Sequence, residues 1–142
     1  MIRRMRDDDL PAVARLWLEA NLDAHSFIPS DYWQGQLARV RSMLPLAEVY
    51  VHETASGRGI DGFLGLSGGH IQGLFVRREA RCGGIGKALL DAVKARCPRL
   101  TLQVYRDNPR AAAFYRREGF RVLEEGVDED TGRAEYLMVW ER

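Results

Sequence analysis

A glycine-rich segment in the second half of the chain has the composition of a phosphate-binding loop. It reads Arg81-Cys82-Gly83-Gly84-Ile85-Gly86-Lys87 and precedes an apolar pattern at helical spacing. The first turn of a helix carries unpaired N–H groups and the positive end of the helix dipole, so it attracts phosphate. Glycines let the backbone approach an anion closely, and the basic residues at each end add positive charge. The alternative interpretation is a tight turn whose glycines serve geometry alone.

Three phosphate-binding patterns can be compared with this loop. The nucleoside-triphosphate loop needs glycine at position 81 and Ser or Thr at position 88, where the chain has Arg81 and Ala88. The dinucleotide fingerprint needs a third glycine at position 89, where the chain has Leu89. The third pattern is Gln or Arg, two residues, Gly, one residue, then Gly or Ala. The run from 81 to 86 matches that pattern in full.

On this pattern the chain resembles the GNAT family of N-acetyltransferases. The segment Leu74–Leu90 resembles the acetyl-CoA-binding motif of the family, and Asn108–Phe120 resembles its second motif. Both occur in the order and spacing of the family, and the resemblance covers the whole chain. The N-terminal part is similar to a branch of small bacterial members, some of which are thought to acetylate protein lysines. The residues that carry this second likeness are Leu16–Glu19, His25, Phe27–Ile28 and Tyr32–Trp33.

The resemblance implies that acetyl-CoA is bound as co-substrate. The strand Leu74–Val76 would run beside the pantetheine arm, with its backbone N–H groups bonded to the pantetheine and the thioester carbonyl. The glycine-rich loop would hold the pyrophosphate, and Asn108 would face the cofactor as well as capping its helix. An ordinary core role for Leu74–Val76 is compatible with these backbone contacts. The expected acetyl-CoA-binding residues are Leu74, Phe75, Val76, Arg81, Cys82, Gly83, Gly84, Ile85, Gly86, Lys87, Asn108 and Tyr115.

Two side chains are the expected catalytic residues. Tyr115 is interpreted as a general acid, because a phenol near the departing sulfur can protonate the coenzyme A thiolate. Simple packing beside Phe114 and Phe120 is the alternative. An amine with a pKa of about 10 must also lose a proton before it attacks. His70 aligns with a catalytic glutamate of some GNAT enzymes, and histidine titrates near neutrality.

The acceptor is expected to be a primary amine: a protein lysine, a protein N-terminus or a small amine. It should enter near residues 21–29 and the last hairpin, which holds five acidic residues between 124 and 130. These carboxylates would attract a cationic amine, although a solvated acidic turn without a role explains them equally well. Gln103 replaces a second carboxylate of other members and can hold a water but cannot act as a base. The expected substrate-binding residues are Glu19, His25, Phe27 and Gln103, of which Glu19 and His25 are further candidates for the base.

The surrounding sequence predicts the elements that position these residues. Three aspartates at 7–9 suit a helix start, and apolar residues between 10 and 20 recur at helical spacing. Turn residues at 56–59 and 68–69 separate strand patterns and predict an antiparallel meander. A helix from the glycine-rich loop to Pro98 joins two strands that should therefore be parallel, and another helix runs from Asn108 to Gly119. The other predicted elements are strands 2–6, 47–53, 60–67, 70–76, 100–105, 120–127 and 134–140, a loop at 21–29 and a helix at 30–44.

Together these elements predict a mixed α/β (α+β) fold with one mostly antiparallel sheet flanked by helices. The resemblance implies that the parallel strand pair splays apart. The length of 142 residues predicts one domain, 1–142. The net charge of +1, from 21 basic and 20 acidic residues, disfavours a nucleic-acid partner.

Composition also limits location and partners. An apolar run long enough for a membrane span is absent from the sequence, and so is a signal-peptide pattern at the N-terminus, so a cytoplasmic protein without a membrane partner is expected. Cys82 and Cys97 lack the spacing of a zinc site, and we expect no metal. A monomer or homodimer is expected. The alternative to an enzyme is an acetyl-CoA-binding sensor or interaction protein without turnover.

Overall fold

The computed structural model describes residues 1–57 and 59–142, and within them seven strands form one sheet in the order β1-β2-β3-β4-β5-β7-β6. The strands are β1 (Ile2–Arg4), β2 (Glu48–Glu53), β3 (Ile60–Ser67), β4 (His70–Val76), β5 (Arg99–Tyr105), β6 (Arg121–Val127) and β7 (Ala134–Glu141). The helices are α1 (Leu10–Ala24), α2 (Ser30–Met43), α3 (Ile85–Lys94) and α4 (Pro109–Arg117), with 3-10 turns at Asp7–Asp9, Leu44–Leu46 and Arg78–Ala80. Arg58, in the predicted turn at 56–59, lies outside the described residues.

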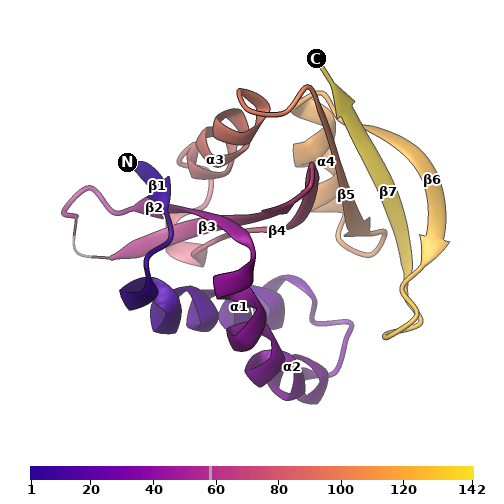
Figure 1. Cartoon of the computed structure of the whole chain (residues 1–142). Helices are drawn as coiled ribbons and strands as arrows, with labels where there is room; N and C mark the ends of the chain where they lie inside the picture. The colour runs from indigo at the N-terminus through magenta and orange to yellow at the C-terminus, as the bar shows by residue number, and fades with distance from the viewer. Residues whose placement is uncertain (58) are drawn as a thin grey trace.

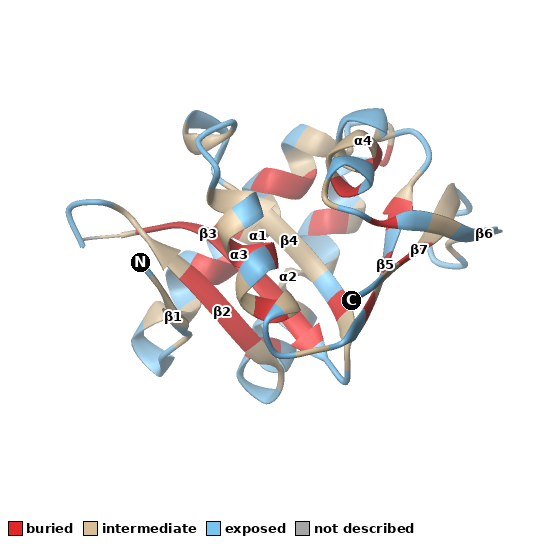
Figure 2. Ribbon diagram, turned by 90° about the horizontal axis from the view of Figure 1, so that it is seen from above, coloured by how far each residue is buried: buried red, intermediate tan, exposed pale blue. Residues whose placement is uncertain are grey.

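Helices cover both faces of the sheet (Figure 1), with α1 and α2 on one face and α3 on the other. Successive side chains of β2 point to opposite faces of the sheet, so both faces carry apolar residues that a helix can cover. Val49 and Val51 pack with Val13 of α1, whereas Tyr50 belongs to the core on the α3 side. Figure 2 shows buried residues concentrated in β2 and β3, while β6 is exposed along nearly its whole length. The apolar stripe of α3 supplies Leu89, which is fully buried.

The parallel strands β4 and β5 are paired only at one end. Their register pairs His70 with Thr101 and Ile71 with Leu102, although β4 continues to Val76. An irregularity in the pairing of β3 with β4 near Gly65 marks a β-bulge on β4 before Gly73. Beyond Ile71 the strands therefore diverge, and the backbone groups of β4 that face β5 can bind another partner. The predicted mixed sheet with a splayed parallel pair is confirmed.

Three predicted boundaries are wrong. The helix expected to run to Pro98 ends at Lys94. The loop expected at 21–29 begins later, because α1 continues to Ala24. Asn21 accommodates this extension by donating its side-chain amide to the Trp17 carbonyl oxygen one turn earlier, at 2.9 Å. The strand expected at 2–6 ends at Arg4, since the carboxylate of Asp9 accepts the Arg6 N–H at 2.7 Å and starts the helical turn there. Among the described helices, none combines the length and apolar character needed to cross a membrane.

Candidate active site

A cavity of about 270 Å³ lies where β4, the glycine-rich loop, α4 and the end of α1 meet. We call it the main cavity. It collects most of the residues that the sequence indicated for acetyl-CoA, and several that it did not. Its lining consists of Ala20, Ala24, His25, Leu74, Phe75, Val76, Ala80, Arg81, Cys82, Gly84, Ile85, Gly86, Lys87, Asn108, Arg110, Ala111, Phe114, Tyr115 and Arg117.

The glycine-rich loop has the backbone geometry of an anion-binding turn. Gly84 adopts a φ of +83° and forms the N-cap of α3, a left-handed conformation that suits glycine. Cys82 also has a positive φ, of 66°, which is uncommon for a residue with a Cβ atom. Gly86 lies against α4, so that a Cβ atom there would be 3.3 Å from the Phe114 ring. The first turn of α3 therefore presents its free N–H groups at the main cavity.

Cationic side chains surround this turn. Among the described residues that line the main cavity, Arg81, Lys87, Arg110 and Arg117 are basic, and none is acidic. Arg81 is paired with Asp23 of α1 at 2.6 Å, and Lys87 is paired with Glu118 at 3.2 Å. That hydrogen bond to Glu118 raises the pKa of Lys87, which stays charged at neutral pH. The donors and charges present fit a phosphate-bearing ligand such as coenzyme A.

The cationic side chains of α4 were missed by the sequence reasoning, although their spacing carries a signal. Arg110, Phe114 and Arg117 follow one another at steps of four and three, which places them on one face of the helix. Asn108 and Tyr115 were already expected at the main cavity. The spacing therefore indicates that the neighbouring face of α4 also lines it.

Tyr115 sits in the wall of the main cavity, and only 8% of its surface is exposed. Its ring packs edge-on against Phe114 and Phe120, with centroids 5.2 and 5.6 Å away. Burial raises the pKa of Tyr115 well above the usual tyrosine value, so the hydroxyl stays protonated. The ring thus packs beside Phe114 and Phe120, and this packing is compatible with a proton donor at the same position.

His25 lies in the main cavity beside Asn108. Its Nε2 is 3.1 Å from the Asn108 amide nitrogen, and its Nδ1 is 2.8 Å from Oδ1 of Asn21. Asn108 is the N-cap of α4 and accepts the Ala111 N–H at 3.3 Å. Burial lowers the pKa of His25 to about 4, so its ring is neutral at pH 7.

Five predicted site residues lie outside the lining of the main cavity. Phe27 lies in the loop between α1 and α2. Gly83 is exposed in the loop. Glu19 lines a smaller cavity of about 160 Å³ between α1 and Arg77–Glu79. The half-buried His70 has Nδ1 at 2.7 Å from the Thr101 hydroxyl, and burial lowers its pKa. Gln103 donates its amide to Glu135 at 3.1 Å.

The face of β5 that carries Gln103 turns away from the core shared with α3. Leu100, Leu102 and Val104 enter that core, so Thr101, Gln103 and Tyr105 point to the opposite face, where α1 and α2 lie. Tyr105 donates its hydroxyl to Asp128 after the end of β6. Burial raises the pKa of Glu135 on the same face, and the nearby charge of Asp128 raises it further.

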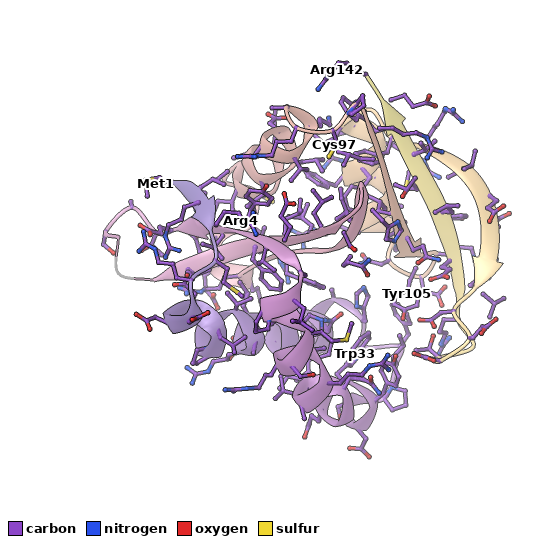
Figure 3. All side chains as sticks on the ribbon, in the orientation of Figure 1. Met1, Arg4, Trp33, Cys97, Tyr105 and Arg142 are labelled. Carbon is purple, nitrogen blue, oxygen red and sulfur yellow. The ribbon has the colours of Figure 1, made fainter. Side chains whose placement is uncertain are left out.

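Aromatic rings and a bridge between two loops close this face. Trp33 and Tyr105, which Figure 3 labels, come from α2 and β5, and both of their rings contact the His25 ring. Phe27 contacts His25 and Tyr105, with centroids 5.6 Å apart in each case. Arg133, in the turn between β6 and β7, donates to the Phe27 carbonyl oxygen at 2.5 Å and lies over its ring. We call the Arg133–Phe27 contact the loop bridge.

Solved structures share this architecture. The solution structure of the apo form of YjaB from Escherichia coli superposes with a TM-score of 0.88 at 28% identity, covering 99% of this chain and 96% of that one. The PaiA N-acetyltransferase of Thermoplasma acidophilum, solved in complex with coenzyme A, gives a TM-score of 0.80 at 20% identity, covering 100% and 98%. The similarity to the Thermoplasma acidophilum protein shows a common fold.

Sequence comparisons are consistent with the architecture. The chain is 35% identical over 142 residues to the peptidyl-lysine N-acetyltransferase YiaC of Escherichia coli (strain K12), covering 99% of this chain and 96% of the relative. It is 30% identical over 137 residues to the peptidyl-lysine N-acetyltransferase YjaB of the same strain, covering 96% and 92%. Residues 12–120 match the acetyltransferase (GNAT) family. The chain therefore belongs to the GNAT family of acetyltransferases and uses acetyl-CoA as its acyl donor.

Proposed function

We propose that this acetyltransferase transfers an acetyl group from acetyl-CoA to the side-chain amine of a lysine in a protein or peptide. One observation carries the chemical part of the proposal: a single cavity joins a cationic glycine-rich loop to the protonated phenol of Tyr115. The names of the two relatives in Escherichia coli, both peptidyl-lysine N-acetyltransferases, support the choice of acceptor.

Residues of the main cavity would bind the pantetheine arm and the pyrophosphate of acetyl-CoA. The backbone of Leu74–Val76, at the diverging end of β4, would bond the pantetheine arm. The first turn of α3 would hold the pyrophosphate, with Lys87 beside it. Arg110 and Arg117 add positive charge from α4. The coenzyme would thus extend from the gap between β4 and β5 to the charged mouth of the cavity.

Transfer requires attack by the amine nitrogen on the thioester carbonyl carbon. The new C–N bond forms, the C–S bond breaks, and the sulfur leaves as a thiolate that needs a proton. Tyr115 is assigned as the donor of this proton, because its phenol lies in the wall of the main cavity and is protonated at neutral pH. A backbone N–H of β4 would stabilise the negative charge that develops on the carbonyl oxygen.

The amine must also lose a proton, and His70 is assigned to accept it. When Nδ1 donates to the Thr101 hydroxyl, Nε2 carries a lone pair. The lowered pKa of His70 favours the neutral form, which can accept a proton directly or through a water. Gln103 and Glu135 line the same face, where they can hold such a water and attract the ammonium group of the lysine.

Coenzyme A release across a panel of amines tests the proposal. The panel holds a lysine peptide with a blocked N-terminus, a lysine-free peptide with a free N-terminus, and polyamines and amino acids. We expect release with the lysine peptide and its loss in Tyr115→Phe. Tyr136→Phe is the matched control, because Tyr136 lies on β7 outside the lining of the main cavity. Release with the free N-terminus alone would overturn the lysine assignment, and acetyl-CoA binding without release for any amine would favour a sensor.

A further inference from the structure

A chain of hydrogen bonds joins the end of α1 to the start of α4 across the wall of the main cavity. It runs from Asn21 through His25 to Asn108. Asn21 is only 2% exposed, and the contact between His25 and Asn108 spans 83 positions of the sequence. A buried polar chain of this kind must have donors and acceptors that match at every link.

The donors and acceptors of this chain allow one consistent assignment. The side-chain nitrogen of Asn21 donates to the Trp17 carbonyl oxygen, so Oδ1 of Asn21 is the atom that faces His25. His25 must then carry its hydrogen on Nδ1 and donate it to that oxygen. Its Nε2 is left as an acceptor.

The same assignment determines how the amide of Asn108 is turned. The nitrogen of Asn108 faces the acceptor Nε2 of His25 at 3.1 Å. Its oxygen therefore faces the Ala111 N–H and caps α4. A protonated His25 would present an N–H to the Asn108 amide nitrogen, placing two donors against each other. The lowered pKa of His25 is consistent with this arrangement.

The imidazole ring is also held by its aromatic neighbours. The centroid of its ring lies 5.6 Å from that of Phe27, 5.6 Å from that of Trp33 and 5.0 Å from that of Tyr105. These rings come from the α1–α2 loop, α2 and β5, and they restrict rotation of the ring about its side-chain bonds. Both nitrogens of His25 therefore have defined positions.

We propose that His25 is a positioning residue of the acetyl-CoA site: the neutral ring orients the Asn108 amide, and through it the first turn of α4 that leads to Tyr115. The sequence predicted that His25 binds the acceptor amine, whereas this proposal gives it a role in binding acetyl-CoA, the acyl donor. This inference rests on the family's use of acetyl-CoA and does not depend on which amine is acetylated.

Two substitutions at the same position separate the roles of the two ring nitrogens. In His25→Asn the side-chain amide reaches the position of Nδ1, near Asn21, but stops short of Asn108. In His25→Gln the side-chain oxygen reaches the position of Nε2 and can accept from Asn108. We would measure coenzyme A binding by calorimetry, and KM and kcat for acetyl-CoA and for a lysine peptide.

We expect His25→Asn to raise the Kd for coenzyme A and the KM for acetyl-CoA about tenfold, the effect of one lost hydrogen bond. We expect His25→Gln to stay within about threefold of the wild type, and the peptide KM to change by less than about twofold in both. Thermal unfolding of both variants establishes that each is folded. Unchanged coenzyme A affinity in His25→Asn would overturn the proposal, as would equal losses in the two folded variants. Calorimetry needs no acceptor, so failure of the lysine assignment would leave this test intact.

Discussion

Tyr115 combines packing and chemistry in one side chain. Its ring fills space between Phe114 and Phe120, and its hydroxyl is the proposed proton donor. Replacement by Phe keeps the ring and removes the hydroxyl. We therefore expect Tyr115→Phe to lower kcat about 100-fold and to change the KM for acetyl-CoA little. Steady-state kinetics with a lysine peptide measure this, and a variant within about threefold of wild-type kcat would exclude the phenol as the acid.

The buried His25 makes stability depend on pH. Its pKa is about 4 in the folded protein and about 6.5 in an unfolded chain. Between these values the unfolded state binds more protons, so the free energy of unfolding falls as the pH is lowered from 6.5 toward 4. We expect His25 to account for a loss of about 2 kcal/mol between pH 7 and pH 5.

Urea denaturation of the wild type and of His25→Gln at both pH values isolates this effect. The variant lacks the titrating ring but keeps every other ionisable group, so its loss of stability should be smaller by about 2 kcal/mol. Equal losses in the two proteins would show that His25 takes up its proton as readily in the folded state as in the unfolded one.

The glycine-rich loop depends on its backbone conformation. Gly84 has a φ of +83°, and a Cβ atom there would meet nothing within 4 Å. Gly84→Ala should therefore cost about 1 kcal/mol of unfolding free energy through backbone strain alone, and it should weaken coenzyme A binding by disturbing the start of α3. Gly126→Ala is the matched control, because Gly126 also has open space and has no positive φ. Equal stability of the two variants in urea would contradict the argument from strain.

The loop bridge ties the turn between β6 and β7 to the loop between α1 and α2. Arg133→Ala removes the hydrogen bond to the Phe27 carbonyl oxygen and the contact with its ring. We expect the KM for a lysine peptide to rise about threefold, with the KM for acetyl-CoA unchanged. Arg121→Ala, which removes an exposed ion pair with Glu141, should change neither value. If Arg133→Ala raised only the KM for acetyl-CoA, the loop bridge would support binding of acetyl-CoA and not of the lysine peptide, which would contradict this prediction.

Local signals predicted most of the elements correctly. Asn108 and Pro109 marked the start of α4, and the oxygen of Asn108 does cap that helix. The end of α1 was predicted four residues too early, because Asn21 normally favours turns. In the structure its side chain is buried and bonded to Trp17 within the helix. Local sequence does not show whether the tertiary structure will bury an amide and satisfy its hydrogen bonds.

The main cavity and the face proposed for the acceptor differ in charge, although the net charge of the chain is only +1. Basic side chains line the main cavity, whereas Asp128, Asp130 and Glu135 gather near the face of β5 proposed for the acceptor. Both substrates should therefore bind more weakly as salt increases, with a cationic amine affected more than a neutral one of similar shape. KM values for both substrates between 50 and 500 mM salt measure this, and salt-independent values would contradict the electrostatic account.

The long-range contacts mark the limit of what the sequence could predict. The glycine-rich loop, Asn108 and Tyr115 follow from short motifs, and the structure brings them into one cavity. The loop bridge joins positions 106 apart. Contacts of this kind depend on how the whole sheet is assembled, and the composition of the two loops carries no trace of them.

Mass spectrometry of a blocked lysine peptide incubated with acetyl-CoA and the protein tests the central claim most directly. The account predicts one acetyl group on the lysine side-chain nitrogen, formed by the wild type and by Tyr136→Phe and reduced about 100-fold by Tyr115→Phe. Acetylation confined to the free N-terminus of a lysine-free peptide, or equal acetylation of the lysine by Tyr115→Phe, would contradict it.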